Sequence, residues 1–150
     1  MSKIYVDEIA PKTAGGIIEN TINCLAQVST STSPSDGSVI LWNIVSINRG
    51  NVYNSSTGRF TAPITGVYEI GYSLTCDPTT DDFFVRIYKN GSALTNAGAI
   101  YNQLDNNYMQ VSQHVYIELN SGDYLTIVKQ DGAIYTNDDF SSAYFRYIGA

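Results

Sequence analysis

Carboxylates are the most numerous ionisable side chains in this 150-residue chain. Two Asp-Asp pairs occur, Asp81-Asp82 and Asp138-Asp139, and each lies in a hydrophilic, turn-like stretch. Hard cations prefer carboxylate and carbonyl oxygens, so these four residues are candidate Ca²⁺ ligands, although the sequence has no EF-hand-like loop. Glycoside hydrolysis would need carboxylates set across a cleft with one pKa raised by burial, and these turns do not indicate such a cleft.

The other catalytic residue types are scarce. His114 is the one histidine, so Ser-His-Asp and Cys-His schemes both depend on it, and neither has a nucleophile motif beside it. The sequence also has no glycine-rich phosphate loop. We therefore expect a protein that is not an enzyme and that needs no cofactor.

The two cysteines, Cys24 and Cys76, are far apart in the sequence and match no metal-ligand spacing. The first residues do not form the apolar region of a secretory signal, which predicts a reducing compartment. In such a compartment two buried free thiols are expected rather than a disulfide.

Composition excludes further classes of function. The net charge is −6 and the pI is near 4.4, so the chain offers no basic surface for nucleic acid. Charged residues are only 15% of the total, as expected for β-rich surfaces that are polar rather than ionic. No apolar run is long enough to insert into a membrane.

The positioning elements are strands, because no stretch has helical periodicity with caps. Apolar and polar residues alternate through 66–76, and Asn90-Gly91 is a type I′ hairpin signal. Residues 39–48 are apolar and aromatic and are expected to be buried. The other expected strands are 25–29, 59–61, 83–89, 94–101, 108–119, 124–129 and 143–148, which together predict an all-β fold.

Strand periodicity assigns faces. In 66–76, the side chains of Tyr68, Ile70, Tyr72, Leu74 and Cys76 should face the core, and those of Val67, Glu69, Gly71, Ser73 and Thr75 the other side. In 108–119, the inward set is Val111, Gln113, Val115, Ile117 and Leu119, and the outward set is Tyr108, Gln110, Ser112, His114 and Tyr116.

Because alternate loops of an up-and-down run of strands emerge at the same end, three loops, 77–82, 103–107 and 130–139, should lie together. The N-terminal and C-terminal strand ends of the domain should lie at the opposite end. We name the three loops the far-end loops. They are a soluble cap, a Ca²⁺ site, or a surface that recognises a host glycan or receptor. The candidate ligand-facing residues are Asp77, Asp81, Asp82, Asp105, Asn106, Asn107, Asp131, Tyr135, Asn137, Asp138 and Asp139.

A family resemblance covers 24–150. Its spine is Tyr53-x₄-Gly58-x-Phe60-x₂-Pro63-x₂-Gly66-x-Tyr68. Lys89-Asn90-Gly91, the turn Leu119-x-x-Gly122-Asp123 and a final aromatic strand follow in order. This pattern resembles the complement C1q-like domains of the tumour necrosis factor superfamily. The resemblance implies a ten-stranded jelly roll of two sheets that forms a compact homotrimer. It also implies that the C-terminal strand lies between the strands that hold Cys24 and Cys76. Those two strands are then two strand spacings apart, about 9.6 Å, which is too far for a disulfide.

The resemblance also implies that one outward sheet face lies against neighbouring subunits, with a salt bridge from Arg146 to Glu69 across subunits. The alternative is a half-wet sheet face of a monomer. The trimer-interface candidates are Glu69, Gly71, Tyr108, Ser112, His114, Tyr116, Tyr144 and Arg146.

Residues 1–23 form a separate anchoring segment with too few apolar residues to fold alone. Its candidate anchor residues are Ile4, Val6, Ile9, Ile17 and Ile18. The wording of 2–13 is similar to N-termini of bacteriophage fibre and virion proteins, in particular those of marine cyanophages. We therefore expect a virion protein held on the capsid or tail by this segment, as a tail-fibre tip that binds the host receptor. A capsid decoration protein and a bacterial C1q-like adhesion module are the alternatives.

Overall fold

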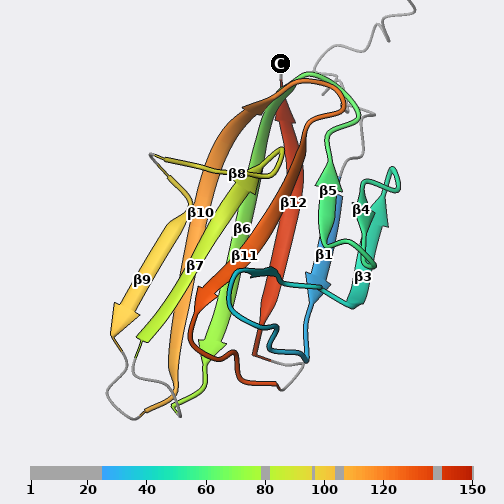
Figure 1. The fold of residues 1–150 in the computed structure, drawn as a ribbon. Coiled ribbons are helices and arrows are strands. Elements are labelled where there is room, and N and C mark those ends of the chain that lie inside the picture. Colours follow the sequence, from blue (N-terminus) through green and yellow to red (C-terminus); the bar gives the residue numbers. More distant parts are fainter. Residues whose placement is uncertain (1–24, 79–81, 96, 104–106, 137–139, 150) are drawn as a thin grey trace, which may run out of the picture.

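The computed structural model describes residues 25–78, 82–95, 97–103, 107–136 and 140–149, and within them the chain forms strands and turns but no helix (Figure 1). Twelve strands make two antiparallel sheets that face each other as a sandwich. The all-β jelly-roll expectation is confirmed. The segment 1–23, Cys24 and the anchor residues lie outside the described residues, so the domain boundary stays a prediction.

The first sheet has five strands in the order β10-β6-β12-β1-β3. They are β10 (Met109–Leu119), β6 (Gly66–Cys76), β12 (Ser142–Gly149), β1 (Leu25–Ser29) and β3 (Ile44–Arg49). The C-terminal strand β12 therefore separates β6 from β1, as expected. Cys76 is a buried free thiol whose pKa is raised to about 12 by burial.

The second sheet has seven strands centred on β11 (Tyr124–Asp131) and β7 (Asp82–Lys89). On one side of them lie β5 (Arg59–Thr61), β4 (Tyr53–Asn54) and β2 (Ser38–Val39), and on the other β8 (Ser92–Ala93) and β9 (Ala99–Gln103). The expected single strand over 94–101 is wrong. Gly98 has a positive φ of 80°, and the chain breaks there into β8 and β9.

Aromatic rings from both sheets fill the core. Phe60 of β5 stacks on Phe145 of β12 with 5.0 Å between ring centroids, and Tyr68 of β6 meets Phe60 edge to face. The inward residues predicted for β6 are all at most 2% exposed. The alternation therefore positions this strand correctly, and it lies between β10 and β12 at the centre of the molecule.

Residues 39–48 are only partly buried, so that expectation needs correction. Ile40 and Trp42 are fully buried, whereas Leu41 and Val45 are 39% and 40% exposed. Val45 lies on β3, the edge strand of its sheet, and Leu41 lies in the connection between β2 and β3, so neither side chain is covered on all sides.

The predicted hairpin at Asn90-Gly91 is present, with φ values of 52° and 80°. Its Asn90 side chain donates to Asp123 Oδ1 at 2.7 Å, and the Asn120 N–H donates to Asp123 Oδ2 at 2.9 Å. Lys89 Nζ lies 3.0 Å from the same carboxylate. The hydrogen bond from Asn90, then that from Asn120, then Lys89 lower the pKa of Asp123 to about 2.

Asp123→Asn should lower the free energy of unfolding at neutral pH, because Asp123 joins two turns through its charge. The folded pKa lies below the ordinary 3.8, so this stabilisation is present above pH 3.8 and is lost as the pH falls toward 2. Urea unfolding across this range should therefore show the difference between wild type and variant narrowing. Glu118→Gln, an exposed change, should show no such narrowing. A constant difference down to pH 2 would contradict the role of the charge.

Candidate functional site

The outward side of the five-stranded sheet brings together residues from three strands. In register, His114 of β10 lies opposite Gly71 of β6, which lies opposite Tyr144 of β12. Two residues further along the strands, and so on the same side of the sheet, a second row contains Tyr116, Glu69 and Arg146. We name these six residues the candidate assembly face, and strand pairing alone places them side by side.

Gly71 makes room for the ring of Tyr144. A Cβ added at Gly71 would lie 2.5 to 2.7 Å from three atoms at the far end of that ring, which real contacts do not show. Because the ring lies over the glycine, its hydroxyl reaches between β6 and β10. Gly71 therefore positions the polar network of this face.

That network runs through two hydrogen bonds. Tyr144 Oη donates to Glu69 Oε1 at 2.8 Å, and His114 Nδ1 lies 2.6 Å from the same hydroxyl oxygen. Since the phenol has one proton and gives it to Glu69, His114 Nδ1 must be the donor to Tyr144. Burial, followed by the neighbouring Glu69, raises the pKa of Tyr144 to about 12, so the phenol remains a donor at neutral pH.

Glu69 is 5% exposed and is the centre of the network. Burial by itself would raise the pKa of its carboxyl. The hydrogen bonds from Tyr144 and Arg146, the charge of Arg146 and the contact with His114 together hold that pKa below its usual value. Glu69 is therefore a carboxylate whose charge is satisfied inside one chain.

The predicted pairing of Arg146 with Glu69 is present, but it forms within one chain and not across subunits. Arg146 Nε pairs with Glu69 Oε2 of the same chain, because β12 pairs directly with β6 and sets the two residues opposite each other. The Arg146 side chain remains 53% exposed and can still contact another molecule.

One aromatic residue of this face is largely uncovered. Tyr116 is 65% exposed and has no hydrogen-bond partner among the described residues. Tyr108, also outward, packs edge to face on Tyr135 at 4.8 Å and so belongs with the far-end loops rather than with Tyr116. Ser112 is exposed between them.

The far-end loops follow β6, β9 and β11, which all end toward the bottom of Figure 1, whereas β1 begins and β12 ends toward its top. The structure places Asp77, Asp82, Asn107, Asp131 and Tyr135 in or beside these loops. Tyr135 N–H donates to Thr75 O at 2.9 Å, and Asp77 N–H donates to Ala133 O at 2.9 Å. Two of the loops are therefore tied to each other. The other candidates lie outside the described residues: Asp81, Asp105, Asn106, Asn137, Asp138 and Asp139.

Among the described residues, the structure shows no set of side chains arranged to bind Ca²⁺. Of the described residues, no three acidic, histidine or cysteine side chains converge as a metal site would require. Three of the four proposed ligands are not described, so a Ca²⁺ site there stays a prediction.

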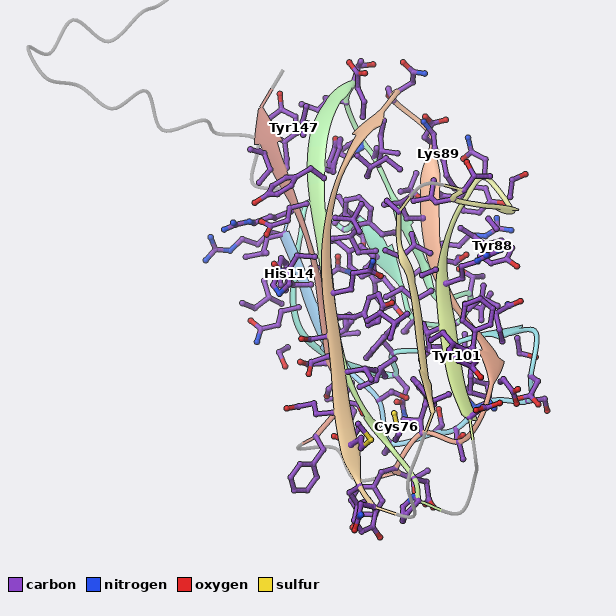
Figure 2. All side chains as sticks on the ribbon, turned by 90° about the vertical axis from the view of Figure 1, so that its left-hand side faces the viewer. Cys76, Tyr88, Lys89, Tyr101, His114 and Tyr147 are labelled. Atoms are coloured by element: carbon purple, nitrogen blue, oxygen red, sulfur yellow. The ribbon has the colours of Figure 1, made fainter. Side chains whose placement is uncertain are left out.

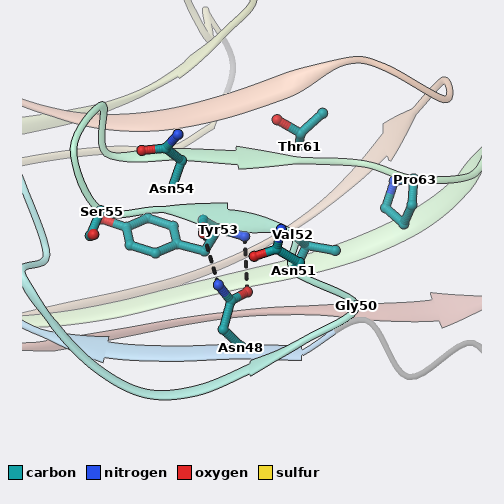
Figure 3. Close-up of a pocket in the computed structure, with 9 residues that line it drawn as sticks. All are labelled: Asn48, Gly50, Asn51, Val52, Tyr53, Asn54, Ser55, Thr61 and Pro63. Atoms are coloured by element: carbon teal, nitrogen blue, oxygen red, sulfur yellow. Dashed lines mark hydrogen bonds between the residues drawn. The ribbon is translucent and has the colours of Figure 1, made fainter.

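Sequence reasoning missed a polar pocket of about 560 Å³ between the edge strands β3 and β4 (Figure 3). Asn48 Nδ2 donates to Tyr53 O at 2.8 Å, and Tyr53 N–H donates to Asn48 Oδ1 at 3.0 Å. The side-chain amide thus replaces a neighbouring strand and satisfies the exposed edge of β4. No sequence pattern marks such a pair, because it joins two different sheets.

The described residues contain no helix long and apolar enough to span a membrane. The arrangement as a whole defines a class: a two-sheet jelly roll with a polar–aromatic face on one sheet and loops gathered at one end.

Comparison with known proteins gives the family. The C1q domain family matches residues 25–148. Complement C1q tumor necrosis factor-related protein 3 of Homo sapiens is 25% identical over 130 residues, which cover 87% of this chain and 52% of that protein, and the Mus musculus protein matches equally. The chain therefore spans about half the length of these curated relatives. It belongs to the C1q domain family.

Solved structures share the fold at low sequence identity. The globular domain of zebrafish complement 1qA superposes with a TM-score of 0.62 at 16% identity, over 81% of this chain and 92% of that one. Murine APRIL superposes with a TM-score of 0.68 at 14% identity, over 83% and 98% of the two chains. The likeness to these structures supports the jelly-roll assignment and nothing finer.

Proposed function

We propose that this chain is a non-enzymatic homotrimeric C1q domain protein whose subunits meet through the candidate assembly face. The observation that carries the proposal is Tyr116, a 65% exposed aromatic residue beside a carboxylate whose charge is satisfied within its own chain. Such a face can be buried without leaving an unpaired charge at Glu69. Large exposed aromatic residues are also the type most enriched in protein interfaces.

The opposite ends of the domain suit two different roles, attachment at one end and contact with the surroundings at the other. The chain enters β1 and leaves β12 at one end, and the far-end loops lie at the other (Figure 1). A trimer anchored through residues 1–23 would therefore present three copies of the far-end loops to its surroundings. Repetition of a weak site at fixed spacing raises the apparent affinity for a surface.

The finer proposal is a virion protein of a bacteriophage, with the domain as a tail-fibre tip that contacts a host glycan or receptor. The support is the similarity of residues 2–13 to phage virion N-termini, together with the position of the far-end loops at the end of the domain opposite the start of β1. The partner of residues 1–23 would then be a capsid or tail protein. The same arrangement also suits a capsid decoration protein or a bacterial C1q-like adhesion module, which differ in what residues 1–23 contact.

Binding of the fluorescently labelled chain to candidate host cells tests the role of the far-end loops. Asp131→Asn and Tyr135→Ala should each reduce cell binding several-fold, because each removes a polar or aromatic group from the far-end loops that would contact the cell surface. Glu118→Gln is a matched loss of one exposed carboxylate near the other end of its strand and should leave binding unchanged. A capsid decoration protein would instead co-sediment with capsids and not with cells. That co-sedimentation should be unaffected by Asp131→Asn and Tyr135→Ala and should be lost when residues 1–23 are removed.

A further inference from the structure

The outer surface of the seven-stranded sheet carries a pocket of about 280 Å³ that neither the candidate assembly face nor the far-end loops use. Its floor and walls follow strand register. Thr126 of β11 lies opposite Tyr88 of β7, and Leu125 lies opposite Phe60 of β5, so Arg59 is level with Thr126 on the next strand. Arg59, Thr126 and Tyr88 therefore form one row across three strands, with Tyr124 beside it.

Arg59 is a cation without a carboxylate. Its guanidinium lies 4.1 Å from the centre of the Tyr124 ring, and among the described residues no acidic group lies within ion-pair distance of it. Lys89, Lys129 and Arg146 each pair with an acid, whereas Arg86, like Arg59, packs on an aromatic ring, but it does not line this pocket. In a chain of net charge −6, an arginine left unpaired at a pocket is therefore notable. A guanidinium stacked on a ring keeps its in-plane N–H groups free for a planar anion.

The remaining walls offer hydroxyls and one aromatic surface. Thr126 is 4% exposed and lies at the floor, and its hydroxyl has no partner among the described residues. Thr57 and the half-buried Tyr88 line the sides. Gly91 keeps the Tyr124 end open, since a Cβ there would come within 3.3 Å of the Tyr124 hydroxyl. A hydroxyl that opens into a pocket and has no protein partner is a group to which a polar ligand can bond.

We propose that this pocket binds one sugar ring of an acidic saccharide. The carboxylate of the sugar would take both in-plane N–H groups of Arg59, which suit a planar bidentate acceptor. The ring would pack on Tyr88, and its hydroxyl groups would bond to Thr126 and Thr57. The volume lies at the lower end of ligand pockets, which suits a single ring. One cation in an acidic chain selects a singly charged sugar over a polyanion, which the net charge repels.

The pocket is accessible in the proposed assembly. Figure 2 shows Tyr88 on one side of the sandwich and His114 on the other, so the pocket and the candidate assembly face belong to opposite sheets. The proposal therefore goes beyond the trimer and does not depend on it. A trimer would carry three such sites.

Amide chemical-shift changes in the full chain, titrated with glucuronate and galacturonate, test the proposal. Saturable millimolar binding should move the signals of Thr126, Tyr88 and Gly91. Glucose has the ring without the carboxylate and acetate has the carboxylate without the ring, so both should bind at least several-fold more weakly. Arg59→Gln should weaken uronate binding about tenfold or more, because it removes a charge-assisted hydrogen bond.

Two further variants keep the result interpretable. Arg49→Gln makes the same change of charge on β3 of the other sheet and should leave uronate binding unchanged. Thr126→Val removes only the floor hydroxyl and should weaken the binding of uronate and leave that of acetate as it was. Equal binding in wild type and Arg59→Gln, equal binding of acetate and uronate, or the absence of saturation would each overturn the proposal.

Discussion

Tyr116→Glu should convert the protein from a trimer into a monomer. In the proposed assembly each chain buries one Tyr116 against a neighbour, so the variant would bury a carboxylate without a cationic partner at three equivalent contacts. The neighbouring Arg146 is already paired with Glu69 and can serve a second carboxylate only by sharing. Each buried, unpaired charge costs several kcal/mol, roughly 3 or more per contact, so trimers should not persist at micromolar concentration. Sedimentation velocity measures the species directly.

The matched control for this change is Tyr101→Glu. Tyr101 is 64% exposed, compared with 65% for Tyr116, but it lies on β9 of the other sheet. The substitution is chemically identical and should leave the trimer intact. If both variants dissociate, or neither does, the assembly does not depend on the candidate assembly face.

Gly71→Ala should lower the free energy of unfolding by about 1 to 3 kcal/mol, the usual cost of adding an atom to a filled space. A Cβ at this position would lie within 2.7 Å of the Tyr144 ring. The ring can move away only by giving up its bonds to Glu69 and His114. The change acts in the folded chain, so chemical denaturation is the suitable measurement.

Two variants show whether the ring of Tyr144 is the cause. Gly149→Ala adds the same atom to another strand glycine of the same sheet, where no atom lies within 4 Å, and should be neutral or slightly stabilising. In a Tyr144→Ala background, Gly71→Ala should cost much less than it does in wild type. An equal cost in both backgrounds would contradict the packing of Tyr144 over Gly71.

The fold could be predicted because its signals are local. Alternation in β6 and β10, the Asn90-Gly91 turn and the spine from Tyr53 to Tyr68 each depend on a few neighbouring residues. They also agree with one another, and that agreement favours a single fold. The position of the C-terminal strand, between β6 and β1, followed from the family resemblance and was correct.

The details of the candidate sites depend on residues far apart in the chain, so the sequence predicts them less well. Glu69 and Arg146 were correctly placed on one face, but a sequence does not say whether an ion pair closes within a chain or between chains. Asn48 bonds to Tyr53, only five residues away, but no motif marks an amide that pairs with a strand edge, so it was missed. The unpaired Arg59 was missed because its surroundings come from other strands. The exposure of Val45 was missed because edge strands and central strands have similar apolar composition, and that of Leu41 because an apolar residue in a connection looks the same in sequence as one in a strand.

The most direct test of the trimer is the solution mass by light scattering, measured for the full chain and for residues 24–150. We predict three times the 16.4 kDa of one chain for the full protein, and a trimer again without residues 1–23. That result would place the assembly in the C1q domain and leave residues 1–23 available for attachment. A trimer lost on truncation would instead assign assembly to residues 1–23. A monomer in both cases would contradict the account, and Tyr116, His114 and Arg146 would then be ordinary surface residues.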